Sequence, residues 1–325
     1  MIPSHHMSKQ TILLTGAAGF IGSTLLGKII DTYNIVAVDD FNDFYNPNWK
    51  QENVDPFLSH KNFTLYKTDI TNFHDLAQIF ANHHIDKIVH LAARAGIRPS
   101  IQNPLIYQQV NVGGTLNLLE LAKLHAIKHF VYASSSSVYG NQTKIPFCET
   151  DPVNEPISPY AASKKSAEMF CHVYANLYKI KTTCLRFFTV YGPKGRPDMA
   201  PYLFTKAIIN GDTIKQFGDG STKRDYTYID DIVEGVAKAI EKPFDFEIIN
   251  LGNNKPVSLK EFIATIEKVS DKKANIQVLP MQAGDVEKTY ADISKAKKLL
   301  DWEPQTDLET GLKIFIEWYK NSHTE

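Results

Sequence analysis

The chain has 325 residues, of which 43% are hydrophobic and 22% are charged, and its 35 basic residues nearly balance its 36 acidic ones. This composition is typical of a globular protein with a large core, divided into a main domain and a smaller one. The charge balance excludes a global field that would attract nucleic acid or an anionic membrane. The scattered cysteines Cys148, Cys171 and Cys184 indicate neither a disulfide framework nor a zinc site, and they suit a reducing cytoplasm.

The N-terminal residues 1–7, MIPSHHM, do not resemble the start of a strand and are interpreted as a possible cloning remnant. They are excluded from the fold prediction, and His5 and His6 are given no metal role. No apolar run approaches membrane-spanning length, and the start of the chain has no signal-peptide core. We expect no metal site and no membrane segment.

The stretch 11–22, TILLTGAAGFIG, organises the first half of the chain. A short apolar run with β-branched residues is followed by Gly16, Gly19 and Gly22 and then by a helical pattern over 20–30. The three glycines are expected to turn the chain out of the strand, to let the backbone approach a pyrophosphate and to let the helix pack tightly. The pattern therefore predicts a phosphate cradle at a helix N-terminus.

A second strand, 35–38, ends in Asp39, twenty residues after Gly19. This spacing suits a carboxylate that accepts hydrogen bonds from the adenosine ribose hydroxyls of a dinucleotide. Asp40 adds a second negative charge, and no arginine follows closely. A 2′-phosphate would be repelled here, so the sequence favours NAD over NADP.

Strands and helices alternate in the residues that follow. We expect an irregular loop over 39–50, a strand over 63–67, a helix over 72–83 and a buried strand over 87–92. His90, inside this last strand, is interpreted as a buried, hydrogen-bonded residue rather than a catalytic one. The alternation predicts an α/β fold with a doubly wound parallel (Rossmann) sheet.

The next helix is expected over 104–126 even though Gly113 and Gly114 lie in its middle. The paired glycines suggest a close approach, either to the sheet or to the cofactor. A fifth strand over 129–134 ends in the serine run 134–137. In open parallel sheets ligands bind beyond the carboxyl ends of the strands, where these hydroxyls are expected to lie.

A long helix is predicted over 158–178, with Ser158 as N-cap and Pro159 at the first helical position. Tyr160 and Lys164 lie one turn apart on the same face. A phenol is a poor base at neutral pH unless a cation lowers its pKa, and Lys164 is expected to supply that cation. Such a pair is common by itself, but it becomes specific together with the cradle and the serine run.

The C-terminal half is expected to form the smaller domain, a substrate-binding α/β unit. Asp230 and Asp231 precede an apolar-periodic run that continues through Ile240. Helix capping is the favoured interpretation of Asp230.

Together, GAAGFIG, Asp39, SSSSVYG and YAASK resemble the extended short-chain dehydrogenase/reductase superfamily, the group of NAD-dependent nucleotide-sugar epimerases and dehydratases. The resemblance covers nearly the whole chain from about Thr11. The stretches DDFNDFYNP, HLAARAGIRPS, GRPDMA, RDYTYIDDIVEG and MQAGDVEKTYAD are similar to the UDP-glucuronate 4-epimerases in particular. The resemblance implies an NAD-binding Rossmann domain and a nucleotide-sugar-binding domain, formed by residues 8–189 plus about 226–252 and by residues 190–225 plus about 253–325, respectively.

The resemblance implies 4-epimerisation of a UDP-sugar, UDP-glucuronate to UDP-galacturonate, through a transient 4-keto intermediate. Tyr160 would take the proton of the 4-hydroxyl while C4 gives hydride to NAD, and Lys164 would bind the nicotinamide ribose. Ser135 would hydrogen-bond the 4-hydroxyl, with Ser136 and Ser137 as close alternatives. Net redox is zero, so NAD is regenerated in each cycle.

The resemblance also implies a set of binding residues. The cofactor contacts would be Gly16, Gly19, Phe20, Ile21, Gly22, Asp39, Asp69, Ile70, Leu91, Ala93, Asn111, Tyr160, Lys164 and Phe188. The substrate contacts would be Ser136, Ser137, Thr189, Arg196, Arg224 and Asp285. Arg224 would clamp the diphosphate, Asp285 the uridine ribose, and Arg196 with Thr189 the C6 carboxylate of the sugar.

Two departures from related enzymes sharpen this interpretation. Ser136 and Ser137 stand where the dTDP-glucose 4,6-dehydratases carry an Asp-Glu pair, so the acid for dehydration is missing. Gln282 stands where UDP-glucose 4-epimerases usually carry an arginine.

A 4-epimerase of UDP-glucose or UDP-N-acetylglucosamine remains an alternative, as does a catalytically silent NAD-binding regulator. The resemblance further suggests a homodimer formed through the helices over 104–126 and 158–178.

Overall fold

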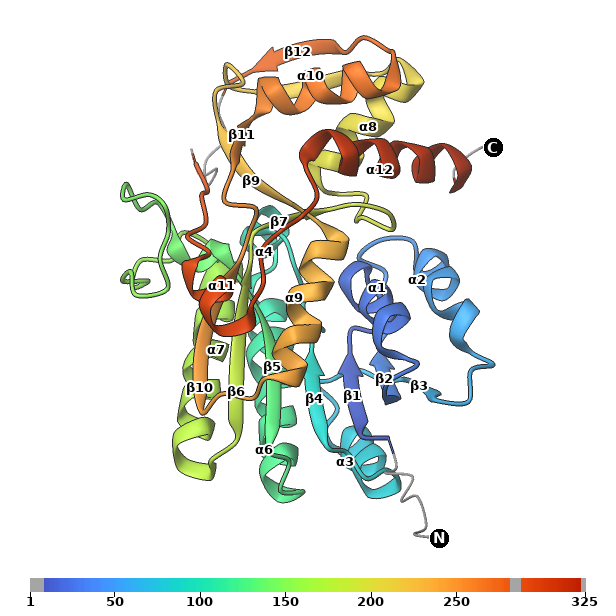
Figure 1. Ribbon diagram of the computed structural model, residues 1–325, viewed down its shortest axis with the longest axis vertical. Coiled ribbons are helices and arrows are strands. Elements are labelled where there is room, and N and C mark those ends of the chain that lie inside the picture. Colours follow the sequence, from blue (N-terminus) through green and yellow to red (C-terminus); the bar gives the residue numbers. More distant parts are fainter. Residues whose placement is uncertain (1–8, 281–287, 323–325) are drawn as a thin grey trace, which may run out of the picture.

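A parallel sheet forms the centre of the protein, whose computed structural model describes residues 9–280 and 288–322. The sheet has seven strands in the order β10-β6-β5-β4-β1-β2-β3, and every neighbouring pair is parallel (Figure 1). Its strands are β1 (Thr11–Thr15), β2 (Asn34–Asp39), β3 (Phe63–Lys67), β4 (Lys87–His90), β5 (His129–Ser135), β6 (Lys181–Phe187) and β10 (Phe246–Leu251). The strand order reverses between β1 and β4, which is where a doubly wound sheet binds ligands. The doubly wound parallel fold expected from the sequence is thereby confirmed.

Helices cover both faces of the sheet and give the protein two hydrophobic cores. The helices of this part are α1 (Phe20–Ile29), α3 (Phe73–Asn82), α6 (Thr115–Leu124), α7 (Pro159–Tyr178) and α9 (Ile229–Glu241). Ile12 and Leu14 face the core that includes α1 and α9, whereas Leu13 faces the core that includes α3, α6 and α7. Because successive strand residues point to opposite faces, one apolar run fills both cores.

A second group of elements lies beyond the carboxyl ends of the sheet strands, in the upper part of Figure 1. One small sheet has the order β11-β9-β7, and another pairs β12 with β8. The elements are β7 (Thr189–Tyr191), α8 (Ala200–Asn210), β8 (Thr213–Phe217), β9 (Lys223–Tyr228), β11 (Pro256–Ser258), α10 (Leu259–Ser270), β12 (Asn275–Leu279) and α12 (Leu308–Ser322). The helix α11 (Ser294–Leu300) instead packs beside the main sheet, against β10 and α9. The domain boundaries given above remain a prediction.

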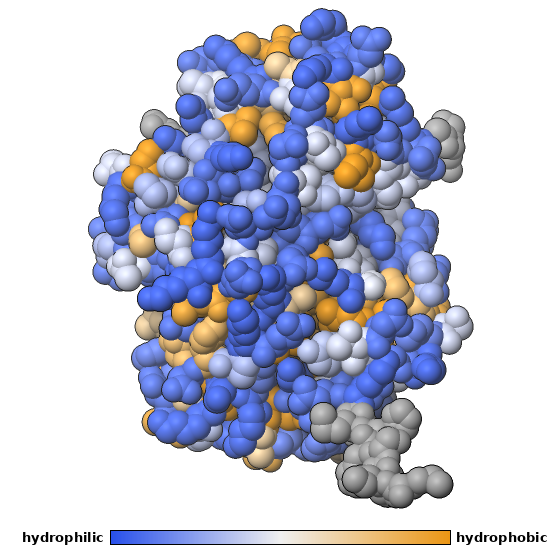
Figure 2. Space-filling view, viewed as in Figure 1, coloured by the Kyte–Doolittle hydropathy of each residue, from blue (hydrophilic) through white to orange (hydrophobic). Residues whose placement is uncertain are grey.

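The molecular surface is mostly polar on the side drawn in Figure 2, where apolar residues form small, separate patches. No described helix is both long and apolar enough to cross a membrane.

Three local expectations need correction. The loop expected over 39–50 gives way to α2 (Pro47–Val54), because Asn46 caps the helix by accepting from the Asn48 N–H and Pro47 takes the first turn. The helix expected over 104–126 is divided into α5 (Pro104–Tyr107), a π-helical segment, η2 (Gln108–Gly114), and α6. Asp230 is not the cap of α9, since Tyr228 holds that position.

Gly114, the second of the two glycines in this divided helix, has a packing reason. A Cβ atom on Gly114 would lie 2.5 Å from Cδ1 of Ile70, so only glycine lets the helix come this close. A π-helical segment of this kind often marks a functional site. Short helical and 3-10 segments complete the fold, namely α4 (Ile97–Gln102), η1 (Asp55–Phe57) and η3 (Ser136–Tyr139).

Candidate active site

A cavity of about 630 Å³ lies at the carboxyl ends of the sheet strands, between the sheet and the second group of elements. It is lined by nearly all the residues expected at the site: Gly16, Gly19, Phe20, Ile21, Gly22, Asp39, Asp69, Ile70, Leu91, Ala93, Ser135, Ser136, Ser137, Tyr160, Lys164, Phe188, Thr189, Arg196 and Arg224. Asn111 is not among the lining residues, and Asp285 lies outside the described residues. Segments from residue 16 to residue 224 therefore converge on one space.

The glycine cradle is shaped by close backbone contacts. Gly16 has φ +71°, and a Cβ atom there would lie 2.7 Å from the backbone N of Ala92. A Cβ on Gly22 would lie 2.0 Å from the carbonyl oxygen of Gly16, so this helix position also requires glycine. Gly19 is the N-cap of α1, and no side chain caps the helix. The uncapped N–H groups at the helix N-terminus therefore face the cavity and suit an anion.

Asp39 ties the end of β2 to the cradle. Its Oδ2 accepts from the Ala18 N–H at 3.0 Å and its Oδ1 from the Phe41 N–H at 3.0 Å. Burial raises the pKa of this carboxyl above its ordinary value, and the two backbone hydrogen bonds act in the opposite direction. The charge of Lys50 also lowers it, although no cation directly follows Asp39 in the sequence.

Two cationic residues near Asp39 and Asp40 were not predicted from the sequence. Lys50, on α2, is 4% exposed and donates from Nζ to the Asn42 carbonyl at 2.7 Å. Arg94, in the loop after β4, places Nη2 3.9 Å from Oδ2 of Asp40, and both cations line the cavity. The buried Nε of Arg94 has no hydrogen-bond partner among the described residues. The spacing of these residues from Asp39 gave no signal, because folding alone brings them together.

Tyr160 and Ser135 form a hydrogen-bonded pair in the wall of the cavity. Ser135 ends β5 and hydrogen-bonds the Tyr160 hydroxyl, which lowers the pKa of the phenol. Burial outweighs this and raises the pKa of Tyr160 above its ordinary value, while the nearby charge of Arg196 acts to lower it. Of the three candidate serines, Ser135 is thus the one placed against the phenol. Its Oγ also donates to Oγ of Ser137 at 3.1 Å.

Lys164 lies one turn further along α7, with its ammonium directed at the end of β5. The Nζ atom donates to the Ala133 carbonyl at 2.6 Å and lies 5.0 Å from the ring centroid of Tyr132. The side chain is 3% exposed, and burial lowers the pKa of Lys164 to about 7. The cation that acts on Tyr160 here is Arg196, so the expected influence of Lys164 on the phenol remains a prediction.

Arg196 places a positive charge in the cavity wall near Tyr160. Its Nε donates to Oδ1 of Asp198 at 3.0 Å and its Nη2 to Oδ2 of Asp198 at 2.6 Å. The guanidinium Cζ lies 5.3 Å from the ring centroid of Phe44. Asp198 and Phe44 line the cavity as well. Neither residue was singled out from the sequence, although Asp198 stands in the quoted GRPDMA stretch.

Asn111 occupies a supporting position behind the cavity wall. It is 1% exposed, its Oδ1 accepts from the Arg94 N–H at 2.8 Å, and its Nδ2 donates to the Arg94 carbonyl at 2.9 Å. The same Nδ2 lies 2.9 Å from Oγ of Ser163, which donates to the Tyr160 carbonyl at 2.8 Å. Asn111 thus joins the loop that carries Arg94 to the helix that carries Tyr160, and its expected contact with the cofactor remains a prediction.

Basic residues gather at the end of the cavity formed by the second group of elements. Arg224 on β9, Lys215 on β8 and Arg98 on α4 all line the cavity. The Cζ of Arg98 lies 5.1 Å from the ring centroid of Phe217. Only Arg224 was expected here, and together these cations suit a diphosphate.

His90 lies beneath the site and is satisfied, as the sequence indicates. Its Nδ1 lies 2.7 Å from Oγ1 of Thr15 and its Nε2 lies 2.9 Å from Oγ1 of Thr115. Burial lowers the pKa of His90 to about 3, so the ring is neutral at physiological pH.

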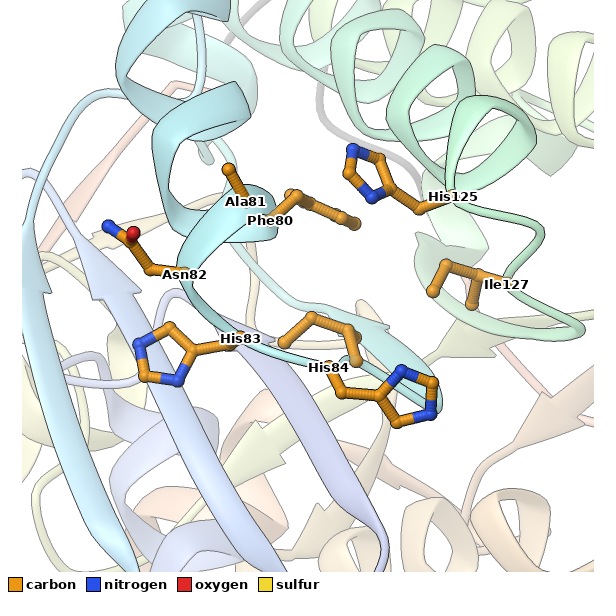
Figure 3. Close-up of a pocket in the computed structure, with 8 residues that line it drawn as sticks. Phe80, Ala81, Asn82, His83, His84, His125 and Ile127 are labelled. Atoms are coloured by element: carbon orange, nitrogen blue, oxygen red, sulfur yellow. The ribbon is translucent and has the colours of Figure 1, made fainter.

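A second hollow, of about 300 Å³, lies where α3 and α6 end and contains three histidines. Figure 3 shows the rings of His83, His84 and His125 on different sides of this hollow. His83 pairs with Tyr66 and the ring of His125 packs on Phe80, so the imidazoles do not converge. In the part of the chain that the structure describes, no three His, Cys, Asp or Glu residues are grouped so as to hold a metal ion.

Comparisons with known proteins identify the family of the chain. The family model of GDP-mannose 4,6 dehydratase matches residues 13–315. A UDP-glucuronate 4-epimerase of Thermodesulfobacterium geofontis is 46% identical over 313 residues, which cover 95% of this chain and 96% of the relative.

Solved structures are similar over nearly the whole chain. The UDP-glucuronic acid 4-epimerase of Bacillus cereus in complex with UDP-glucuronic acid and NAD has a TM-score of 0.89 at 37% identity, covering 96% of this chain and 99% of the other. The UDP-glucose 4-epimerase of Thermotoga maritima with UDP-glucose has a TM-score of 0.89 at 33% identity, with the same two coverages. The chain therefore belongs to the family of nucleotide-sugar epimerases and dehydratases within the extended short-chain dehydrogenase/reductase superfamily.

Proposed function

We propose that this protein is an NAD-dependent isomerase that epimerises UDP-glucuronate to UDP-galacturonate at C4. The observation that carries the proposal is the convergence of a proton-transfer pair, Tyr160 with Ser135, and a cationic fork, Arg196, in one cavity. The charge of Arg196 reaches the Tyr160 hydroxyl. A 4-hydroxyl and a C6 carboxylate lie close together on a glucuronosyl ring, which is the arrangement these side chains would meet.

The residues present fit NAD. The cradle formed by Gly16, Gly19, Phe20, Ile21 and Gly22 would hold the pyrophosphate on the uncapped N-terminus of α1. Asp39 would hold the adenosine ribose, with Asp69 and Ile70 at the adenine, Leu91 and Ala93 along the cofactor and Phe188 near the nicotinamide. Bound there, NAD would supply the hydride acceptor and donor at C4. Arg94, which lines the cavity beside Asp40, would add a positive charge toward the phosphates.

The chain's own groups would move the proton and hold the sugar. Ser135 hydrogen-bonds the 4-hydroxyl and Tyr160 accepts its proton, which returns to the same oxygen once the sugar has turned over. Lys164 would hold the nicotinamide ribose. Arg224 would bind the diphosphate, and Asp285, which lies outside the described residues, would bind the uridine ribose. Ser136 and Ser137 complete the wall beside the sugar.

The 4-keto intermediate of a glucuronosyl unit is a β-keto acid, which loses carbon dioxide if its carboxylate bond aligns with the carbonyl π system. Arg196 and Thr189 would hold that carboxylate still. A guanidinium binds a planar carboxylate through two parallel hydrogen bonds, which fix its orientation as well as its place.

Products resolved by NMR after separate incubation with UDP-glucuronate, UDP-glucose and UDP-N-acetylglucosamine test the proposal. UDP-galacturonate should form fastest. Turnover of the neutral sugars alone would support the UDP-glucose or UDP-N-acetylglucosamine 4-epimerase. No turnover of any of the three, with NAD bound, would support the silent NAD-binding regulator.

We further propose that the protein is a homodimer. We also propose that it resides in the cytoplasm, a reducing compartment in which its free thiols would persist. The support for a dimer is a set of exposed apolar side chains on the helices of one region: Ile101, Leu105, Leu124, Met169, Val173 and Leu177. Leu177→Asp should produce monomers in light-scattering chromatography, because it puts a charge into the proposed interface. Val278→Asp, at an equally exposed site on β12, should leave the molar mass unchanged. A wild-type monomer, or a dimer that survives Leu177→Asp, would argue against this interface.

A further inference from the structure

The ion pair between Arg196 and Asp198 occupies the sugar side of the cavity. Both oxygens of Asp198 accept from one edge of the guanidinium, the edge formed by Nε and Nη2. A guanidinium has five N–H donors, so three remain, on Nη1 and Nη2. The remaining edge can receive a second carboxylate while Asp198 stays in place.

The placement of Asp198 is not explained by stability. The two residues are separated by a single residue in one loop, so the pair does not join distant elements. Its side chains are 20% and 36% exposed, and exposed pairs contribute about 0–1 kcal/mol. The proposed substrate carries two anionic groups, a diphosphate and a sugar carboxylate. The carboxylate of Asp198 repels both, so its presence in the cavity wall does not favour substrate binding by charge alone.

Other contacts complete the seat of the guanidinium. Phe44 lies against Arg196, with its ring centroid 5.3 Å from Cζ. On another side, a Cβ built on Gly96 would lie 3.7 Å from Nη2, so the backbone before α4 closes in there. The ring and the backbone limit where the guanidinium can lie, whereas Asp198, through its two hydrogen bonds, fixes the direction of its plane.

We propose that Asp198 is a positioning residue that holds one edge of Arg196 so that the other edge is presented to the C6 carboxylate of the sugar. This inference rests on the proposed function and adds a residue to it. Orientation matters because decarboxylation breaks the C5–C6 bond, sends its electron pair into the C4 carbonyl to form an enolate, and releases carbon dioxide. The enolate then takes a proton at C5, giving a 4-keto pentose. A guanidinium that swings lets the carboxylate reach the alignment for this loss.

The experiment compares Asp198→Ala and Asp198→Asn with wild type on UDP-glucuronate, with products resolved by NMR and affinities of the NAD-loaded protein measured by calorimetry. Asp198→Ala should lower kcat about tenfold and yield a decarboxylated pentose product. The affinity for UDP-glucuronate should change less than about threefold. Asp198→Asn keeps the shape of the side chain but only one acceptor oxygen. Its kcat and product profile should lie between those of wild type and Asp198→Ala. UDP-glucose affinity should stay as in wild type.

Arg196→Ala provides the matched background. If Asp198 acts through Arg196, adding Asp198→Ala to Arg196→Ala should change neither kcat nor the product profile further. Independent, multiplying losses would overturn the inference. So would equal losses of affinity for both sugars with a lowered melting temperature, which indicate a structural role.

A tenfold gain in UDP-glucuronate affinity at unchanged kcat would overturn it too, because Asp198 would then compete with the substrate. Wild type that epimerises UDP-glucuronate, with Asp198 variants that behave like it, would remove this inference alone. Wild type with no activity on UDP-glucuronate would instead remove the proposed function.

Discussion

The two halves of the cavity are built in different ways. The proposed cofactor half is built around a backbone cradle, in which Gly16 and Gly22 must be glycine because a Cβ atom there would lie 2.7 and 2.0 Å from neighbouring backbone atoms. The sugar half is made of side chains from distant segments, among them Ser135, Tyr160 and Arg196. A backbone cradle can be damaged only by adding atoms, whereas a side-chain site is damaged by removing them. Substitutions in the two halves should therefore fail in different ways.

The largest effect is expected from Tyr160→Phe, which removes only the hydroxyl from the sugar half. Epimerisation should fall by on the order of a hundredfold to ten-thousandfold, because general base catalysis is lost. Binding of UDP-sugar and NAD should persist, as measured by calorimetry. Turnover close to wild type would place the proton acceptor elsewhere.

Gly22→Ala tests the cofactor half by adding one carbon atom. The new Cβ would meet the Gly16 carbonyl, and because backbone atoms yield little, we expect a cost of about 3 kcal/mol, the upper end for overpacking, seen as weaker NAD binding. Gly27→Ala on the same helix is the control. Its Cβ would lie 3.5 Å from the Phe57 ring, an ordinary contact, so NAD affinity should not change. Equal behaviour of the two variants would contradict the role of the cradle.

Arg196→Ala should separate substrates without disturbing the cofactor half. Turnover of UDP-glucuronate should fall by about 2 kcal/mol, the low end for truncating one partner of a charge pair, because the side chain is partly exposed. Some decarboxylated pentose should appear, and UDP-glucose, which lacks the carboxylate, should be affected much less. The product profile on both sugars is the measurement. Equal losses on the two, with no pentose, would exclude Arg196 from binding the carboxylate.

The smallest effect concerns stability beneath the two halves. Burial lowers the pKa of His90 to about 3, so between pH 6.5 and 3 the unfolded chain binds a proton that the folded protein does not. The neutral ring of His90 therefore contributes its full stabilisation of the folded state above pH 6.5. That stabilisation is lost as the pH falls toward 3. Between pH 6.5 and 5.5 the contribution of His90 to the free energy of unfolding should fall by about 1 kcal/mol. Denaturant unfolding of wild type and His90→Gln should show a shallower acid slope in the variant, with His129, whose pKa is lowered to about 4, retained in both. Parallel slopes would argue against a neutral His90.

The parts of the site that the sequence predicted are those encoded by neighbouring residues. The cradle, Asp39 at the end of β2, and Tyr160 with Lys164 on one face of α7 each occupy a single strand–turn–helix or a single helical turn, where spacing dictates geometry. The residues that were missed, Lys50, Arg94 and Asp198, act across loops whose course depends on packing. Even the start of α2 at Pro47 was hidden, because an Asn-Pro step marks both loops and helix starts.

The sequence by itself thus determined the alternation of strands and helices, the parallel sheet and the glycines of the cradle, because hydrophobic period and backbone sterics act over a few residues. Only the tertiary structure decided which serine meets Tyr160, that the charge of Arg196 reaches the phenol, and that Asp198 occupies one edge of that arginine. The physical reason is range. Charges and hydrogen bonds between distant segments depend on how the second group of elements packs over the sheet, and no local pattern records that packing.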